Sequence, residues 1–157
     1  MGQPKWGIPS GHGAQQGEEH GKGRRLGPHI DPALQQSGIS TNGACFAPDA
    51  TFVDLSQGLT ASGRDKILAY GHRRITAISD ACYANTRITE ASGPVTLQSD
   101  GQGVNDGPFG SFPATGKRVS FPIFNVIAVN DDGQIARMEQ LYDRLDILIK
   151  LGHMPPG

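Results

Sequence analysis

Apolar and polar positions follow two different periods along the second half of the chain. Apolar residues spaced as on one helix face predict a helix over residues 63–79, with Ser62 as its N-cap and Asp65 completing an S-x-x-D capping box. The apolar positions of this helix are Ile67, Leu68, Tyr70, Ile75 and Ile78. Strand-like runs predict strands over residues 51–55, 83–90 and 94–98. A Gly-rich stretch over 100–116 is typical of a long loop, with a short strand near 109–112.

The clearest pairing lies near the end of the chain. Residues 117–129 and 134–142 predict two strands of a β-hairpin around the turn Asn130–Gly133, where glycine supplies a positive φ. Helical apolar spacing then predicts a short helix over 144–151 that stops at Gly152. Strands and helices in this order indicate an α+β domain.

Residues 1–43 have a different composition from the rest. They contain ten of the 22 glycines and only nine apolar residues, so they cannot bury enough apolar surface to offset the entropy of ordering. We interpret them as a disordered Gly-rich tail, with one short helix near 31–36, and residues 44–157 as the folded domain. The spacing of His12, His20 and His29 matches no familiar set of metal ligands.

Charge and composition narrow the range of partners. With 14 Lys+Arg against 15 Asp+Glu in 157 residues, the chain has no overall attraction for nucleic acid. No apolar run approaches the ~18 residues of a membrane span, and no signal peptide follows Met1, so we expect a single cytoplasmic domain without membrane contact. Cys45 and Cys82 form no disulfide framework or zinc pattern. Because neither the histidines nor the cysteines have the spacing of metal ligands, we expect no metal. We also expect no cofactor, and the glycines of the 100–116 loop open no helix that could cradle a phosphate.

Five segments in order resemble one known family. They are Phe-Ala-Pro-Asp-Ala-Thr-Phe (46–52), Gly-Arg-Asp-Lys-Ile (63–67), Thr-Gly-Lys-Arg-Val-Ser-Phe-Pro (115–122), Asp-Gly-Gln-Ile (132–135) and Tyr-Asp-Arg-Leu-Asp-Ile-Leu-Ile-Lys-Leu-Gly (142–152). Together they resemble the SnoaL-like polyketide cyclases of the nuclear-transport-factor-2-like superfamily. The resemblance implies a cone-shaped α+β fold, in which a curved antiparallel sheet wrapped by helices encloses one deep apolar pocket.

The same resemblance implies that Asp143 is the catalytic acid/base of an aldol-type ring closure. Period two independently places Asp143 on one strand face with Arg137 and Leu141. A two- or four-residue hairpin loop would set Ser120, Pro122, Phe124 and Val126 opposite that face, whereas a three-residue loop would invert the pairing. Burial in such an apolar setting would raise the pKa of the Asp143 carboxyl. Alternatively, Asp143 is simply the N-cap of the last helix.

The remaining candidates are bulky or polar groups that would line a pocket. Each aromatic among them is also a plausible core residue, and Arg137 could instead form a surface pair with Glu139. The predicted substrate-binding residues are Phe52, Tyr70, Phe109, Pro122, Phe124, Arg137 and Leu141.

We therefore expect a cofactor-free cyclase or isomerase that moves a proton on a small hydrophobic carbonyl substrate. The alternative is a non-catalytic cone-fold module for ligand binding or dimerisation. Residues 117–129 lack the histidine that many SnoaL-like cyclases place there, and 31–43 is short for the family's first helix, which both favour the alternative. An epoxide-opening hydrolase ranks last because no second Asp aligns with Asp143 and Arg137. The family also implies a homodimer through the open face of the sheet.

Overall fold

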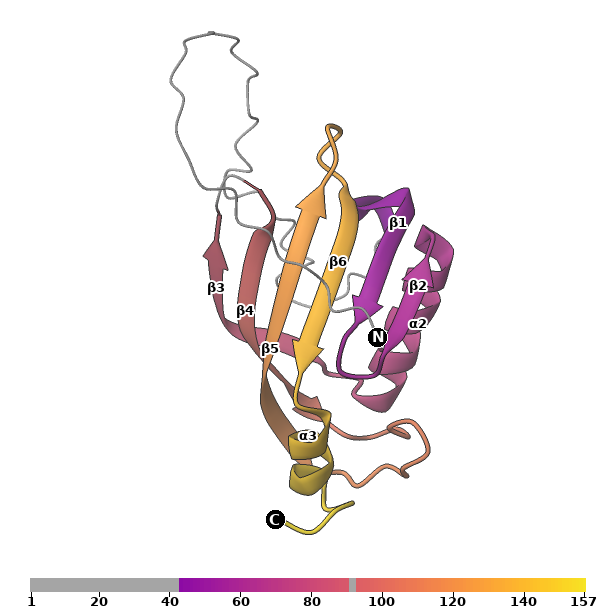
Figure 1. The fold of residues 1–157 in the computed structure, drawn as a ribbon. Coiled ribbons are helices and arrows are strands. Elements are labelled where there is room, and N and C mark those ends of the chain that lie inside the picture. The colour runs from indigo at the N-terminus through magenta and orange to yellow at the C-terminus, as the bar shows by residue number, and fades with distance from the viewer. Residues whose placement is uncertain (1–42, 91–92) are drawn as a thin grey trace, which may run out of the picture.

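The computed structural model describes residues 43–90 and 93–157, which form one six-stranded sheet and two α-helices (Figure 1). The strand order is β2-β1-β6-β5-β4-β3, so the sheet is open and β2 and β3 are its edges. The predicted tail, apart from Gly43, and its short helix lie outside the described residues. The α+β class is confirmed, but the sheet is mixed rather than antiparallel throughout, because β1 and β6 run parallel.

The first structural unit is a hairpin that leads into the long helix. A short 3-10 turn, η1 (Gly43–Cys45), precedes β1 (Phe46–Asp54), which pairs antiparallel with β2 (Leu59–Ser62). Helix α2 (Arg64–Ala77) then packs against β1 and β2. The predicted capping box is wrong. Ser62 ends β2, and Gly63 is the N-cap, at φ 91° and without a side-chain hydrogen bond.

The second unit is longer than the sequence pattern indicates. Strands β3 (Cys82–Thr89) and β4 (Val95–Val104) pair antiparallel, and β4 continues through residues assigned above to a loop. Glycine is required there by close packing. A Cβ at Gly101 would lie 3.0 Å from the ring of Phe121, and a Cβ at Gly103 only 2.3 Å from Ile78. The short strand predicted near 109–112 is a single bridge between Phe109 and Phe112.

The predicted hairpin is confirmed as β5 (Arg118–Val129) and β6 (Ile135–Tyr142). The register of this hairpin shifts by one residue close to the turn. Val129 pairs with Ile135 across a five-residue connection, but a shift at the next pair sets Ala128 opposite Arg137. The shift restores the pairing of faces expected for a two- or four-residue loop but not the individual partners, because Leu141 lies opposite Phe124 rather than Pro122.

Helix α3 (Arg144–Leu151) has the predicted limits. Its N-cap is Asp143, whose carboxylate accepts a hydrogen bond from the backbone N of Asp146 at 3.0 Å. Gly152 ends the helix at φ 86°, in the left-handed conformation that glycine adopts without strain. The helix packs against β5 at one end of the sheet.

Alternation along the strands separates a buried inner face of the sheet from an exposed outer face. On β5 the odd-numbered residues from Val119 to Ile127 are buried and the even-numbered ones from Ser120 to Val126 are exposed. The inner faces of β1, β4, β5 and β6 pack with α2 into the core. In the part of the chain described here, no helix is long and apolar enough to cross a membrane.

Candidate functional site

A cavity of about 260 Å³ lies between α2, the inner face of the sheet and the loop before β5. All three tyrosines of the chain, Tyr70, Tyr83 and Tyr142, line it. The remaining wall is largely apolar, with Phe109 and Phe121 among its members. Such a hollow, with few polar groups among aromatic rings, is the usual form of a small-molecule site.

The polar end of the cavity is built around Asp54, which is fully buried behind the lining. Its carboxylate accepts hydrogen bonds from the hydroxyl groups of Tyr70 and of Tyr142, the latter at 3.0 Å. Gln57 adds two more, from its backbone N at 3.0 Å and its side-chain Nε2 at 3.0 Å. Asp54 is the acceptor in all four of these bonds.

Local sequence explains how these groups meet. Asp54 follows Phe52 at period two and therefore faces inward, at the point where β1 ends. Its bond to the backbone of Gln57 closes the turn into β2, an arrangement typical of Asp at turns. Tyr142 ends the neighbouring parallel strand, and the hydroxyl of Ser56 binds both the backbone N and O of Tyr142. The turn and the end of β6 are thereby held together.

Helix α2 supplies Tyr70 and Arg74, which are four residues apart and so share one helix face. The Arg74 guanidinium donates to Gln140 and lies 5.3 Å from the ring centroid of Tyr142. Gln140 in turn donates to the hydroxyl of Tyr83 at 3.1 Å and to Asn125 at 2.9 Å. A buried polar network therefore continues from the cavity across the inner face of the sheet.

Burial controls the ionisation of this cluster. Desolvation raises the pKa of Tyr70, and the hydrogen bond to Asp54 adds to the increase although Arg74 opposes it. Desolvation likewise raises the pKa of Tyr142 and of Tyr83. Burial alone would lower the pKa of Arg74, but the neighbouring tyrosines and Asp54 outweigh it and raise the pKa. At neutral pH the tyrosines are therefore protonated and Arg74 is charged.

The structure brings few of the predicted site residues to this cavity. Tyr70 and Phe109 line it. Phe52 is fully buried in the core, with its ring 5.1 Å from that of Tyr70. The others lie on the outer face: Pro122, Phe124, Arg137 and Leu141.

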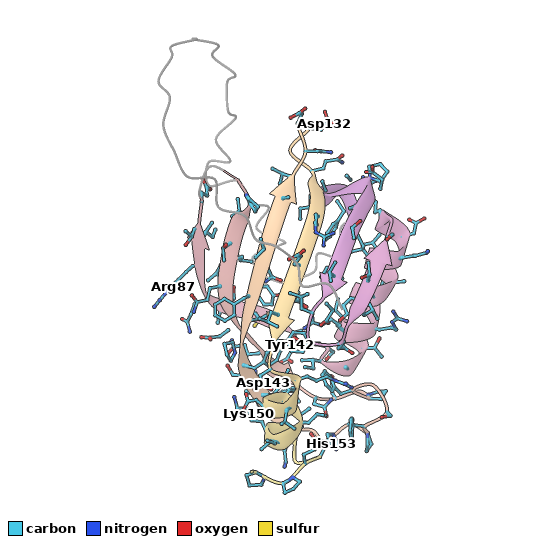
Figure 2. The ribbon with its side chains drawn as sticks, in the orientation of Figure 1. Arg87, Asp132, Tyr142, Asp143, Lys150 and His153 are labelled. Atoms are coloured by element: carbon cyan, nitrogen blue, oxygen red, sulfur yellow. The ribbon has the colours of Figure 1, made fainter. Side chains whose placement is uncertain are left out.

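Asp143 also lies away from the cavity. Figure 2 labels Tyr142 and Asp143 where β6 passes into α3, and only Tyr142 lines the cavity. Asp143 is exposed, so the apolar surroundings predicted for it are wrong, while its predicted role as N-cap is confirmed. The predicted pairing of faces between β5 and β6 holds, although it arises through a five-residue connection and a register shift rather than a two- or four-residue loop. The chosen face of β6 is the outer one.

Sequence reasoning missed Asp54, Gln57 and Arg74. A signal for Asp54 was present, because period two sets it on the same face as the predicted pocket residue Phe52. The described residues contain no group of three His, Cys, Asp or Glu side chains placed to bind a metal ion.

Comparison with known proteins gives this fold a family. A family model described as the SnoaL-like domain matches residues 29–138, which is more than half of the chain. The chain belongs to the SnoaL-like domain family. The match begins within the predicted tail and ends before Asp143. No curated protein matches this SnoaL-like chain.

Solved structures share the fold of this SnoaL-like domain. One is a hypothetical protein with a ketosteroid isomerase-like fold from Catenulispora acidiphila, in complex with trimethylamine, at 23% identity and a TM-score of 0.68 over 82% of this chain and 98% of that one. Another is a candidate SnoaL-like polyketide cyclase from Jannaschia sp. CCS1, at 20% identity and a TM-score of 0.65 over 71% and 76%. A third is a phenazine biosynthesis-related protein from Pseudomonas aeruginosa, at 16% identity and a TM-score of 0.66 over 80% and 82%. At these identities the likeness shows the fold, and family membership supports cyclase or isomerase chemistry only in general.

Proposed function

We propose that the protein is a cyclase or isomerase that moves a proton at the carbon beside a carbonyl group of a small hydrophobic substrate. The observation that carries this proposal is the buried Asp54 carboxylate, which accepts hydrogen bonds from two tyrosines that line the cavity. This arrangement supplies a base and a proton relay in one place.

In this mechanism Asp54 acts through a tyrosine, because Asp54 itself lies behind the wall of the cavity. The hydroxyl oxygen of Tyr142 accepts the proton from the substrate carbon while its own proton passes to Asp54. No tyrosinate forms, which suits hydroxyl groups whose pKa is raised by burial. The substrate's C–H electron pair moves into an enolate, and the Arg74 cation stabilises the charge on its oxygen.

The reverse transfer completes either reaction. In an isomerisation, Asp54 returns the proton through Tyr142 to a different carbon of the enolate. In a ring closure, the enolate carbon attacks a second carbonyl of the substrate, and the resulting alkoxide takes the proton back along the same route. Both reactions leave the overall oxidation level of the substrate unchanged, so neither needs an oxidant or reductant, and the proton returned by Asp54 restores the protein to its starting state.

A matched pair of variants tests this assignment against the sequence-based choice of Asp143. Exchange of α-protons for deuterium in a tetralone, with and without a carboxylate substituent, can be followed by NMR. We expect Asp54→Asn to slow enzyme-dependent exchange by at least about a hundredfold, the usual loss for a general base. Asp143→Asn keeps a good N-cap and is expected to stay within about twofold. The opposite result would return the catalytic role to Asp143, and equal rates in both variants would remove the proposal.

The outer face of the sheet supports a second candidate function, which is dimerisation. Leu141, Phe124 and Val126 are adjacent across β5 and β6 and are 51%, 40% and 40% exposed. The exposed ion pair of Arg137 and Glu139, at 2.7 Å, borders them. In a two-fold dimer this patch contacts the same patch of the other copy, so Arg137 of each copy can pair with Glu139 of the other.

Sedimentation of two leucine variants tests this candidate. Leu141→Lys places a charge in the patch and is expected to give a monomer. Leu145→Lys is the matched control, because Leu145 is 54% exposed but lies on α3. A wild-type chain that sediments as a monomer would exclude the dimer.

A further inference from the structure

The cavity carries a positive charge that the chain as a whole does not have. Arg73, Arg74 and Arg144 all line it, and none of the described residues that line it carries a carboxylate. The described residues form three ion pairs, and none of the three arginines takes part in them. Asp54, behind the wall, offsets one of these charges. The remaining excess is local, since the whole chain has a formal charge of −1.

Arg144 is the least compensated of the three. Its Nε is buried without a hydrogen-bond partner, although the residue as a whole is only partly buried. Burying a charged donor without an acceptor is costly, because the lost hydration is not replaced. The guanidinium lies beside the loop that closes the cavity, where a Cβ on Gly110 would be 3.5 Å from its Nη2. Arg144 thus has an unused donor at the wall of the cavity.

The other two arginines are partly engaged. Arg74 binds Gln140 and lies over the ring of Tyr142. Arg73 is exposed, with its guanidinium 5.9 Å from the ring centroid of Tyr70. These rings and the apolar wall match the flat body of a ligand, whereas the Arg144 guanidinium matches an anionic oxygen group attached to it. A planar guanidinium binds carboxylate and phosphate oxygens well because it presents parallel N–H donors.

We propose that the natural ligand of this cavity is an organic anion, with a flat apolar body against the aromatic wall and a carboxylate or phosphate group bound by Arg144. The inference rests on the proposed function, since it names the substrate class of the same cavity. Arg144 would hold the anionic group, and the carbonyl that reacts would lie at the polar end near Asp54. The anionic group and the reacting carbonyl are therefore different groups of one molecule.

Calorimetric titration with three unreactive probes of one shape tests this proposal. Naphthoate carries a carboxylate, naphthyl phosphate carries a phosphate and naphthamide is neutral. We expect at least one anion to bind about tenfold or more tightly than naphthamide, as expected for a charge-assisted hydrogen bond. The better anion identifies which oxygen group the site prefers. Equal affinity for all three, or no binding of either anion, would overturn the proposal.

Two arginine variants locate the effect. Arg144→Gln is expected to abolish the preference for the anion and to leave the affinity for naphthamide unchanged. The matched control is Arg87→Gln, because Arg87 is exposed at the edge strand β3 and projects away from the cavity (Figure 2). Arg144→Lys keeps the charge and is expected to retain part of the preference, which guards against a loss caused by misfolding. Equal losses in Arg144→Gln and Arg87→Gln would overturn the assignment to Arg144.

The binding experiment is independent of catalysis. Anion-selective binding without proton exchange would reject the proposed function and keep this inference. Exchange of the neutral tetralone without anion-selective binding would do the reverse.

Discussion

The two faces of strand β6 differ in burial and in the interactions that their side chains form. Met138, Gln140 and Tyr142 point inward and are buried, and the last two belong to the polar network of the cavity. Arg137, Glu139 and Leu141 point outward and are partly or largely exposed. Neighbouring residues therefore differ completely in surroundings, so the face of the strand matters more for function than the position along it. Leu141 and Tyr142 are the clearest example, because Leu141 is 51% exposed and Tyr142 is buried.

The largest expected difference between the faces concerns stability. Met138→Ala empties a fully buried position and is expected to cost about 2–5 kcal/mol in the free energy of unfolding. Leu141→Ala, measured at concentrations that keep the chain monomeric, removes a half-exposed side chain and is expected to cost less than about 1 kcal/mol. Denaturant titration of both variants checks this, and similar losses would mean that the two faces are not distinct.

Alkaline pH should affect the inner face selectively. Burial raises the pKa of Tyr142 above its ordinary value of 10.0, so the folded state holds the proton more tightly than the unfolded state. This contribution to stability is complete below pH 10 and is lost as the pH rises towards the folded-state pKa, by up to about 1.4 kcal/mol per pH unit. Tyr142→Phe removes one such group, so the stability of this variant should fall less steeply above pH 10. Parallel curves for the two proteins would contradict the assigned burial.

A smaller effect on stability is expected at Asp143, where β6 passes into α3. Asp143→Ala removes the side-chain cap of α3 and is expected to cost about 1 kcal/mol, whereas Asp143→Asn keeps a capping oxygen and is expected to cost a few tenths. Thermal unfolding of both variants measures the difference. If Asp143→Asn is as damaging as Asp143→Ala, the carboxylate has a role beyond capping.

The elements with local signals could be predicted from the sequence. Helix α3 is delimited by Asp143 and Gly152, and the β5–β6 hairpin by the turn at Gly133, so both emerged with nearly correct limits. Strand β2 was missed because its four residues carry too short a pattern. The extension of β4 was missed because Gly101 and Gly103 are typical of loops, and only the neighbouring Phe121 and Ile78 show why glycine stands there.

The candidate site was harder to predict because its members are brought together by the fold. Asp54 is one acidic residue at the end of a strand, and its partners Tyr70 and Tyr142 lie 16 and 88 residues away. The face of β6 could not be chosen from its pattern, since Leu141 and Met138 offer an apolar residue to either side. Family resemblance drew attention to Asp143, whereas the buried acceptor is Asp54.

The parallel pairing of β1 with β6 has a consequence for how the protein is made. The first and the last described strands must meet before Asp54 and Tyr142 can form their hydrogen bond. Closing so long a loop slows folding, because the chain loses conformational entropy before the stabilising contacts form. During synthesis, the cluster cannot form until residue 142 has left the ribosome. The bond between Asp54 and Tyr142, and with it the polar end of the cavity, is therefore complete only once the last strand is in place.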